Sequence, residues 1–134
     1  MPHKILIVED DAINVKFMKV VLVRKGGYEV EVSEDVEEIL RLAASGEFSA
    51  IIMDISLTRS MYEGQKVDGV FITRLLKSKP ETAKVPVMLA TAHAMFGDKE
   101  RFMAETGAEH YISKPIHDPD FFLAEIRKIL PKES

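Results

Sequence analysis

Short apolar runs alternate with amphipathic segments along the whole chain, and this alternation constrains the fold more than any other feature. The predicted strands are five runs, at residues 5–8, 28–32, 50–53, 87–90 and 110–112. Segments with the apolar period of a helix follow them, at roughly 13–25, 35–45, 69–78, 98–106 and 119–130. Strands that alternate with helices in this way form a parallel sheet with helices on both faces. The sequence therefore predicts an α/β fold, a doubly wound (βα)₅ unit.

Composition and charge exclude several classes of function. The chain has 134 residues, which suits one domain with a single core. Its formal net charge of -4 provides no basic surface for nucleic acid or anionic membranes. Cysteine is absent, which excludes disulfides, thiolate metal sites and a cysteine nucleophile. No apolar run is long enough for a membrane span or a signal peptide, so we expect a cytoplasmic protein.

Polar residues that can do chemistry follow four of the five predicted strands. In open parallel sheets, ligands bind beyond the carboxyl ends of the strands, where the strand order reverses. The residues at these ends are Glu9, Asp10 and Asp11 after the first strand, Asp54 after the third, Thr91 after the fourth, and Ser113, Lys114 and Pro115 after the fifth. The topology thus predicts carboxylates, a hydroxyl and an ammonium at one edge of the sheet.

This set of side chains suits phosphoryl transfer assisted by a hard cation. Clustered carboxylates raise one another's pKa unless a cation lies among them, and a few oxygen ligands suit Mg²⁺. Lys114 can hold a phosphoryl oxygen as a point charge, and Thr91 can donate a hydrogen bond to another. A carboxylate beside both, such as Asp54, can attack phosphorus and form a covalent intermediate.

Each of these residues also has an ordinary structural role open to it. We expect one of the acids at residues 9–11 to cap the helix that starts near Ile13. Thr91 could bond the local backbone at a strand end, and Lys114 could be a solvated surface lysine. For any one of these residues taken alone, the structural role is favoured. Taken together, the residues favour a shared function, because the structural interpretation needs four coincidences at four strand ends.

The motifs ILIVEDD, IIMDISL, VMLATAHAM and YISKPI, in this order, resemble those of response-regulator receiver domains over essentially the whole chain. The resemblance implies the flavodoxin-like receiver fold with strand order 2-1-3-4-5. It implies one receiver (response regulatory) domain over residues 1–134, and we expect no output domain because the chain ends at Ser134, just after the predicted fifth helix. It also implies a phosphoacceptor switch of a two-component or phosphorelay system, a signalling protein rather than an enzyme.

The resemblance assigns the phosphoacceptor and the metal ligands. Asp54 corresponds to the phosphoacceptor, and Lys114 to the lysine that binds the phosphoryl group. Asp10 corresponds to the direct Mg²⁺ ligand and Glu9 to an acid that acts through water. Ser56 lies where the family supplies a backbone carbonyl to the metal.

The resemblance also assigns residues that transmit and time the signal. Thr91 corresponds to the switch hydroxyl and Tyr111 to the aromatic switch residue, although Tyr111 could equally be a packed core ring. Pro115 is implied to follow a cis peptide bond. Ser56 and His93 flank the path of a water that attacks the acyl phosphate. Neither is a carboxylate or an amide, so we expect slow to intermediate self-dephosphorylation, with His93 the larger influence.

The expected partners are proteins. The donor would be a histidine kinase or a histidine phosphotransfer protein, and a downstream target would bind the face made by the fourth helix, the fifth strand and the fifth helix. This region includes more apolar groups than a solvated face requires, although some must belong to the core; its residues are Met95, Phe96, Phe102, His110 and Phe121. We expect no nucleic acid and no membrane partner, and a monomer or weak homodimer.

Two other classes of function remain open at this point. The first is a phosphohydrolase or phosphotransferase with an aspartyl-phosphate intermediate, but such enzymes need a second carboxylate, and the residue two after Asp54 is Ser56. The second is an interaction module that works without phosphate. The complete set of acids, threonine and lysine argues against the second class.

The segment after Asp54 departs from the family pattern. Thr58 stands where the family usually has proline, and Ser56 to Asp68 makes a 13-residue connection. Residues 58–67 show neither helical nor strand periodicity. We expect a mobile loop that becomes ordered on a partner, with Met61 and Tyr62 as its contacts. A tolerated insertion without function is the alternative, since loop closure entropy grows slowly with length.

Overall fold

Five parallel strands form one sheet in the computed structural model, which describes residues 3–92 and 95–131. The strands are β1 (Lys4–Val8), β2 (Glu29–Val32), β3 (Ala50–Asp54), β6 (Val87–Thr91) and β7 (His110–Ser113). Their order across the sheet is β2-β1-β3-β6-β7, and every neighbouring pair is parallel. β6 and β7 are the fourth and fifth strands of this sheet, since β4 (Met61–Tyr62) and β5 (Gln65–Lys66) form a separate pair. The predicted α/β fold and the strand order 2-1-3-4-5 are therefore confirmed.

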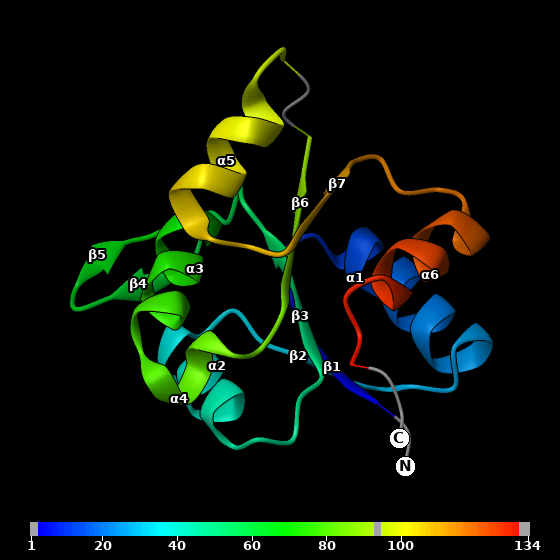
Figure 1. The fold of residues 1–134 in the computed structure, drawn as a ribbon, viewed down its shortest axis with the longest axis horizontal. Coiled ribbons are helices and arrows are strands. Elements are labelled where there is room, and N and C mark those ends of the chain that lie inside the picture. The colour runs from blue at the N-terminus through cyan, green and yellow to red at the C-terminus, as the bar shows by residue number, and fades with distance from the viewer. Residues whose placement is uncertain (1–2, 93–94, 132–134) are drawn as a thin grey trace.

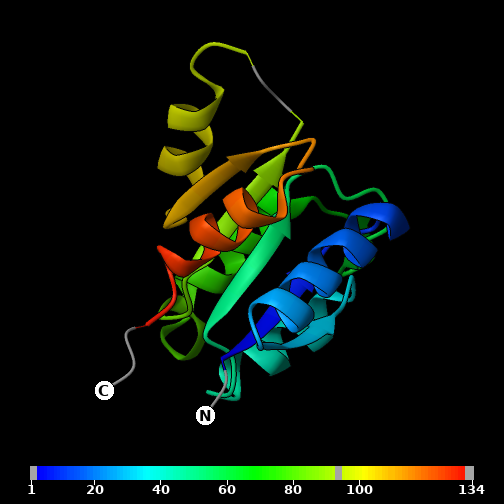
Figure 2. The same ribbon diagram turned by 90° about the vertical axis from the view of Figure 1, so that its right-hand side faces the viewer.

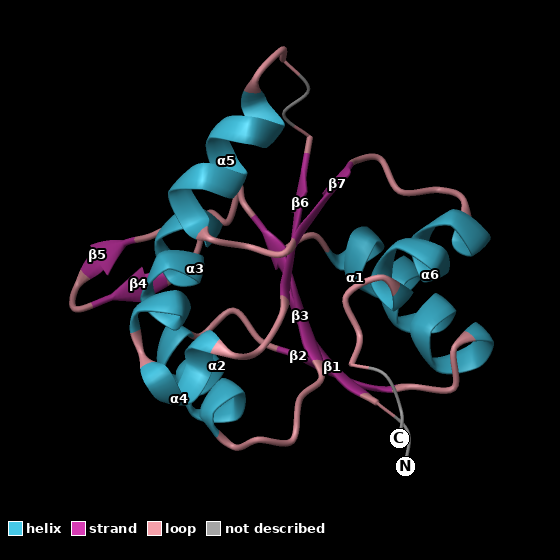
Figure 3. Ribbon diagram, viewed as in Figure 1, coloured by secondary structure: helices cyan, strands magenta, loops and turns pink. Residues whose placement is uncertain are grey.

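Helices cover both faces of the sheet (Figures 1 and 3). One face carries α1 (Ala12–Val20), its π-helical continuation η1 (Val21–Lys25) and α6 (Pro119–Arg127). The other face carries α2 (Val36–Ala44), α3 (Gly69–Ser78), the short α4 (Pro80–Ala83) and α5 (Asp98–Thr106). The turned view of Figure 2 shows α1 in blue and α6 in orange lying over the same side of the sheet.

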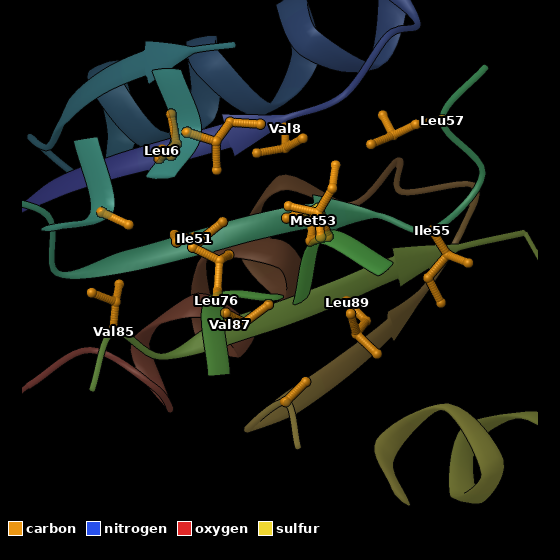
Figure 4. Packing of buried hydrophobic residues seen from close by; sticks show 14 of the residues in the cluster. Leu6, Val8, Ile51, Met53, Ile55, Leu57, Leu76, Val85, Val87 and Leu89 are labelled. Carbon is orange, nitrogen blue, oxygen red and sulfur yellow. The ribbon is translucent and has the colours of Figure 1, made fainter. Parts of the chain in front are cut away.

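Successive residues of the central strands are buried on opposite faces of the sheet. Leu6 and Val8 of β1 belong to the cluster beneath α2 and α3, while Ile5 and Ile7 pack against α1 and α6. Figure 4 shows the first cluster from close by. Because a strand covered on both faces needs apolar residues at every position, the runs at 5–8 and 50–53 are continuous rather than alternating.

The segment 58–67 contains a short antiparallel hairpin, so the expectation of a segment without regular structure is wrong. β4 (Met61–Tyr62) pairs with β5 (Gln65–Lys66), and the two turn residues Glu63 and Gly64 have φ angles of 51° and 81°. A two-residue hairpin turn favours positive φ at both central positions. Strands of two residues are too short to show a period in the sequence.

The hairpin is attached to the body of the domain, beside α3 in Figure 1. The ring centroids of Tyr62 and Phe71 of α3 lie 5.8 Å apart. Ser60, just before the hairpin, is buried and donates a hydrogen bond to the backbone oxygen of Glu34 at 2.8 Å. Tyr62 is therefore a packing residue, whereas Met61 is 48% exposed and remains accessible to a partner.

Candidate functional site

The carboxyl ends of β1, β3 and β7 bring Glu9, Asp54 and Lys114 into contact. The Lys114 Nζ atom lies 2.6 Å from Glu9 Oε1 and 3.2 Å from Asp54 Oδ1. Glu9 and Asp54 are buried, with 2% and 4% of their surface exposed. The ammonium of Lys114 therefore lies against two buried carboxylates that come from different strands.

Asp10 adds a third carboxylate to this group. One carboxylate oxygen from each of Glu9, Asp10 and Asp54 lies within 4.8 Å of the other two. Oxygen ligands from carboxylates, together with several retained waters, are the environment that Mg²⁺ prefers. The donor set of this edge therefore fits the divalent cation that the sequence analysis expects.

Asp11, the third acid after β1, has a different role. Its Oδ1 atom accepts hydrogen bonds from the backbone N–H groups of Ile13 and Asn14, at 2.8 and 3.2 Å. Asp11 is thus the residue that caps α1. Its own N–H donates to Glu9 Oε2 at 3.2 Å, so the cap also helps to hold Glu9.

The pKa values of Glu9 and Lys114 are both raised, which favours the neutral acid at Glu9 and the charged ammonium at Lys114. Burial, reinforced by Asp54, raises the pKa of Glu9 to about 7, although Lys114 opposes the rise. Burial by itself would lower the pKa of Lys114, but the hydrogen bond to Glu9 and the charge of Asp54 raise it above its ordinary value. The site therefore holds more negative charge than one ammonium can neutralise, which favours a bound cation.

The carboxylate of Asp54 is held by the backbone of the segment that follows it. The N–H of Ser56 donates to Asp54 Oδ1 at 3.0 Å. The first residue of α3, Gly69, packs directly on the end of β3, since a Cβ atom there would overlap the backbone oxygen of Asp54. The sequence pattern predicts Gly69 only as the start of a helix, and its glycine identity was the available signal for this close approach.

The predicted switch residues are buried. Thr91, at the end of β6, is completely buried, and its backbone oxygen accepts a hydrogen bond from the N–H of Lys114 at 2.8 Å. Tyr111 is 9% exposed and belongs to the core cluster, so its ring already packs inward. Burial, followed by the charge of Asp98, raises the pKa of Tyr111. The Lys114–Pro115 peptide bond is cis. His93 lies outside the described residues.

The region predicted to bind a downstream target exposes three large apolar side chains. Met95, Phe96 and Phe121 are exposed, and Met95, Tyr111 and Phe121 line a hollow of about 390 Å³. Phe102 is buried in the core cluster, so it does not contribute to this surface. His110 is partly buried, and its Nε2 atom lies 2.9 Å from Glu125 Oε1.

Two residues without a predicted role in the site, Thr58 and Arg59, contact Asp10. The backbone N–H and the hydroxyl of Thr58 donate to Asp10 Oδ2, at 2.9 and 2.8 Å. Arg59 donates to the backbone oxygen of Asp10 at 3.0 Å and makes two hydrogen bonds to Glu34. Burial alone would raise the pKa of Asp10, but the Thr58 donors and the charge of Arg59 lower it. In the sequence, the signal for this contact with Asp10 was the threonine at position 58, where the family usually has proline.

A doubly wound sheet that carries a buried aspartate, a lysine and a pair of acids at its carboxyl edge defines a phosphoacceptor signalling module. The sequence profile of the response regulator receiver domain matches residues 5–127. The chain therefore belongs to the response regulator receiver domain family.

Individual relatives support the same assignment. The polar-differentiation response regulator DivK of Brucella anthropi is 39% identical over 121 residues, which cover 90% of this chain and 91% of that protein. The receiver domain of the sensor histidine kinase PA1611 from Pseudomonas aeruginosa, solved with a magnesium ion coordinated in its active site cleft, is 29% identical. It superimposes with a TM-score of 0.73 over 96% of this chain and 94% of that one.

A more distant structure shares the fold. The chemotaxis response regulator CheY4 of Vibrio cholerae is 22% identical, and it superimposes with a TM-score of 0.79 over 97% of this chain and 100% of that one. The predicted receiver class is thus confirmed, and neither the hydrolase nor the phosphate-independent module is favoured. Among residues 3–92 and 95–131, no helix has the length and apolar character needed to cross a membrane.

Proposed function

We propose that the protein receives a phosphoryl group on Asp54 from the phosphohistidine of a kinase or phosphotransfer protein, in a reaction that requires Mg²⁺. The observation that carries the proposal is the contact of the Lys114 ammonium with Asp54 and Glu9, beside the third carboxylate of Asp10. A nucleophilic carboxylate needs such a cationic neighbour, because the incoming phosphoryl group is itself negatively charged.

The metal would be held by the side chains of Asp10 and Asp54 and the backbone carbonyl of Ser56, with Glu9 acting through water. When bound, Mg²⁺ supplies positive charge that offsets the repulsion between the carboxylates and the phosphoryl oxygens. The support is the chemistry of the three-carboxylate group and the magnesium ion in the related PA1611 receiver domain.

The protein's own residues position the reacting groups. An oxygen of Asp54 forms a bond to phosphorus while the bond between phosphorus and the donor imidazole nitrogen breaks, and the electron pair of that bond returns to the nitrogen. Lys114 holds one phosphoryl oxygen, and the hydroxyl of Thr91 donates to another. The N–H of Ser56, which bonds Asp54 Oδ1 in the structure, keeps the nucleophile oriented.

We further propose that the signal leaves through the surface of α5, β7 and α6. The phosphoryl group adds roughly two negative charges. Movement of Thr91 toward this charge would alter the chain after β6 and stabilise the packed position of Tyr111. The exposed side chains of Met95, Phe96 and Phe121 provide the apolar contact for a protein target. The protein thus acts as one receiver domain that signals by protein contact.

Intact-mass measurement tests the proposal directly. The unaltered protein, incubated with Mg²⁺ and a small acyl phosphate, should gain one phosphoryl group, and a chelator should prevent the gain. Asp54→Asn should gain nothing. Asp120→Asn, at an exposed aspartate whose side chain pairs with Lys25, is the matched control and should be labelled normally. Labelling of Asp54→Asn, or full labelling in chelator, would contradict the assignment.

A further inference from the structure

Thr58 makes two hydrogen bonds to the same oxygen of Asp10, although 48 residues separate them in the chain. The backbone N–H donates to Oδ2 at 2.9 Å and the hydroxyl donates to the same atom at 2.8 Å. A carboxylate with two donors from one residue on one oxygen is fixed in rotation as well as in position. The direction in which its second oxygen points is therefore fixed too.

The two residues after Thr58 anchor this contact. Arg59 Nη2 donates to the backbone oxygen of Asp10 at 3.0 Å, and the same guanidinium pairs with both carboxylate oxygens of Glu34, at 3.1 and 3.0 Å. Ser60 donates to the backbone oxygen of Glu34 at 2.8 Å. Residues 58–60, which we call the tether, thus tie the connection after β3 to the connections after β1 and β2.

The tether depends on the residue that departs from the family pattern. Proline has neither a backbone N–H nor a hydroxyl, so it could make neither of the two hydrogen bonds to Asp10. Threonine provides both donors. The hairpin that follows, with Tyr62 packed on Phe71, holds the far end of the same segment against α3.

We propose that Thr58 is a positioning residue for the cation site: it holds the Asp10 carboxylate in the orientation in which that carboxylate binds Mg²⁺. The inference rests on the proposed function, because it requires Asp10 to be a metal ligand. Groups that hydrogen-bond a ligand orient it before the metal arrives, and their removal commonly lowers metal affinity about 10–100-fold. Because coupling between two sites is reciprocal, bound Mg²⁺ should in turn strengthen the tether.

Mg²⁺ affinity of the full chain, measured by calorimetric titration, tests the inference without any phosphoryl transfer. Thr58→Val keeps the shape of the side chain and the N–H but removes the hydroxyl, and it should weaken Mg²⁺ binding about tenfold. Thr58→Ser keeps both donors and should retain the affinity of the unaltered protein. Mg²⁺ should also shift the amide NMR resonance of Thr58.

Ser60→Ala is the control that separates positioning from stability. It removes the hydrogen bond to the backbone of Glu34, while the two donors of Thr58 and the bond of Arg59 to the Asp10 backbone stay in place. Its thermal stability should fall while its Mg²⁺ affinity stays unchanged. If Thr58→Val behaves in the same way, the inference is overturned and the proposed function stands. If the unaltered protein binds no Mg²⁺, the proposed function is overturned and this inference with it.

Discussion

The Nζ atom of Lys114 lies 2.6 Å from Glu9 Oε1, although the two residues are 105 positions apart in the chain. Both side chains are largely buried, and Asp54 shares the same ammonium at 3.2 Å. Two carboxylates therefore depend on one cation from the protein. This shortage of positive charge makes the stability of the domain sensitive to pH, to Mg²⁺ and to the loss of Lys114.

Lys114→Met should destabilise the domain, because it leaves Glu9 and Asp54 buried without their cation. Removal of one partner of a buried ion pair costs roughly 3 kcal/mol, although protonation of Glu9 will reduce the loss. We expect about 2 kcal/mol at pH 8 in chelator, partly restored by Mg²⁺, as measured by urea unfolding. Lys128→Met, at an exposed lysine, is the control and should change stability by less than about 0.5 kcal/mol. A loss that Mg²⁺ leaves unchanged would contradict the expectation.

The raised pKa of Glu9 predicts that the metal-free domain loses stability as the pH rises. Its pKa rises from an ordinary 4.5 to about 7, so between these values the folded protein keeps a proton that the unfolded chain has released. This contribution is fully present below pH 4.5 and is lost as the pH passes through 7. Between pH 5 and 8, the unfolding free energy should fall by about 2 kcal/mol more in the unaltered protein than in Glu9→Gln.

Denaturant unfolding in chelator at several pH values measures this difference. Glu37→Gln, at an exposed position of α2, is the matched control and should keep the pH dependence of the unaltered protein. Parallel pH profiles for Glu9→Gln and the unaltered protein would show that Glu9 titrates in the folded state as it does in the unfolded chain.

Gly69→Ala should disturb the site through the backbone of Asp54. The new Cβ atom would overlap the Asp54 backbone oxygen, and backbone atoms cannot move aside as a flexible side chain can. Overpacking of this kind costs about 1–3 kcal/mol. The unfolding free energy should fall by that amount and labelling by acyl phosphate should slow. Arg74→Ala, at an exposed position of the same helix, should affect neither, and a stable, fully active Gly69→Ala would refute the close packing.

Activation should change the environment of α5, β7 and α6. Beryllofluoride with Mg²⁺ imitates the phosphoryl group, and Thr91 and Lys114 connect its site to β6 and β7. Amide NMR shifts should concentrate on these elements and include Tyr111, whose ring lines the hollow beside Met95 and Phe121. Shifts confined to β2 and α2 would contradict the proposed output surface.

The two residues of β4 should affect different properties of the protein: Met61 recognition of the phosphodonor, and Tyr62 the stability of the domain. Met61 is exposed, so Met61→Ser should leave stability and labelling by acyl phosphate unchanged but slow transfer from the cognate phosphohistidine protein several-fold. Tyr62→Ser should instead lower the unfolding free energy by about 1 kcal/mol, since the ring packs against Phe71. Unchanged transfer to Met61→Ser would leave the exposed side of the hairpin without a role in recognition.

Most of the fold could be predicted from the sequence because its signals are local. Burial on both faces makes the central strands continuously apolar, and the period of 3.6 residues marks the helices. The same rules placed Asp54 and Lys114 at strand ends, where the parallel topology brings them together. By contrast, the π-helical turn η1 had no signal in the predicted helix at 13–25, and the strands of the hairpin were too short to show a period.

The sequence by itself therefore determined the architecture and the chemical types of residue at the functional edge. Only the tertiary structure decided which of three consecutive acids caps α1, that Phe102 lies in the core, and that Thr58 holds Asp10. Periodicity and burial act between residues that are close in the chain, so they can be read from the order of residues. A hydrogen bond between Thr58 and Asp10 depends on how two connections from different strands are placed, and that placement exists only once the sheet has assembled.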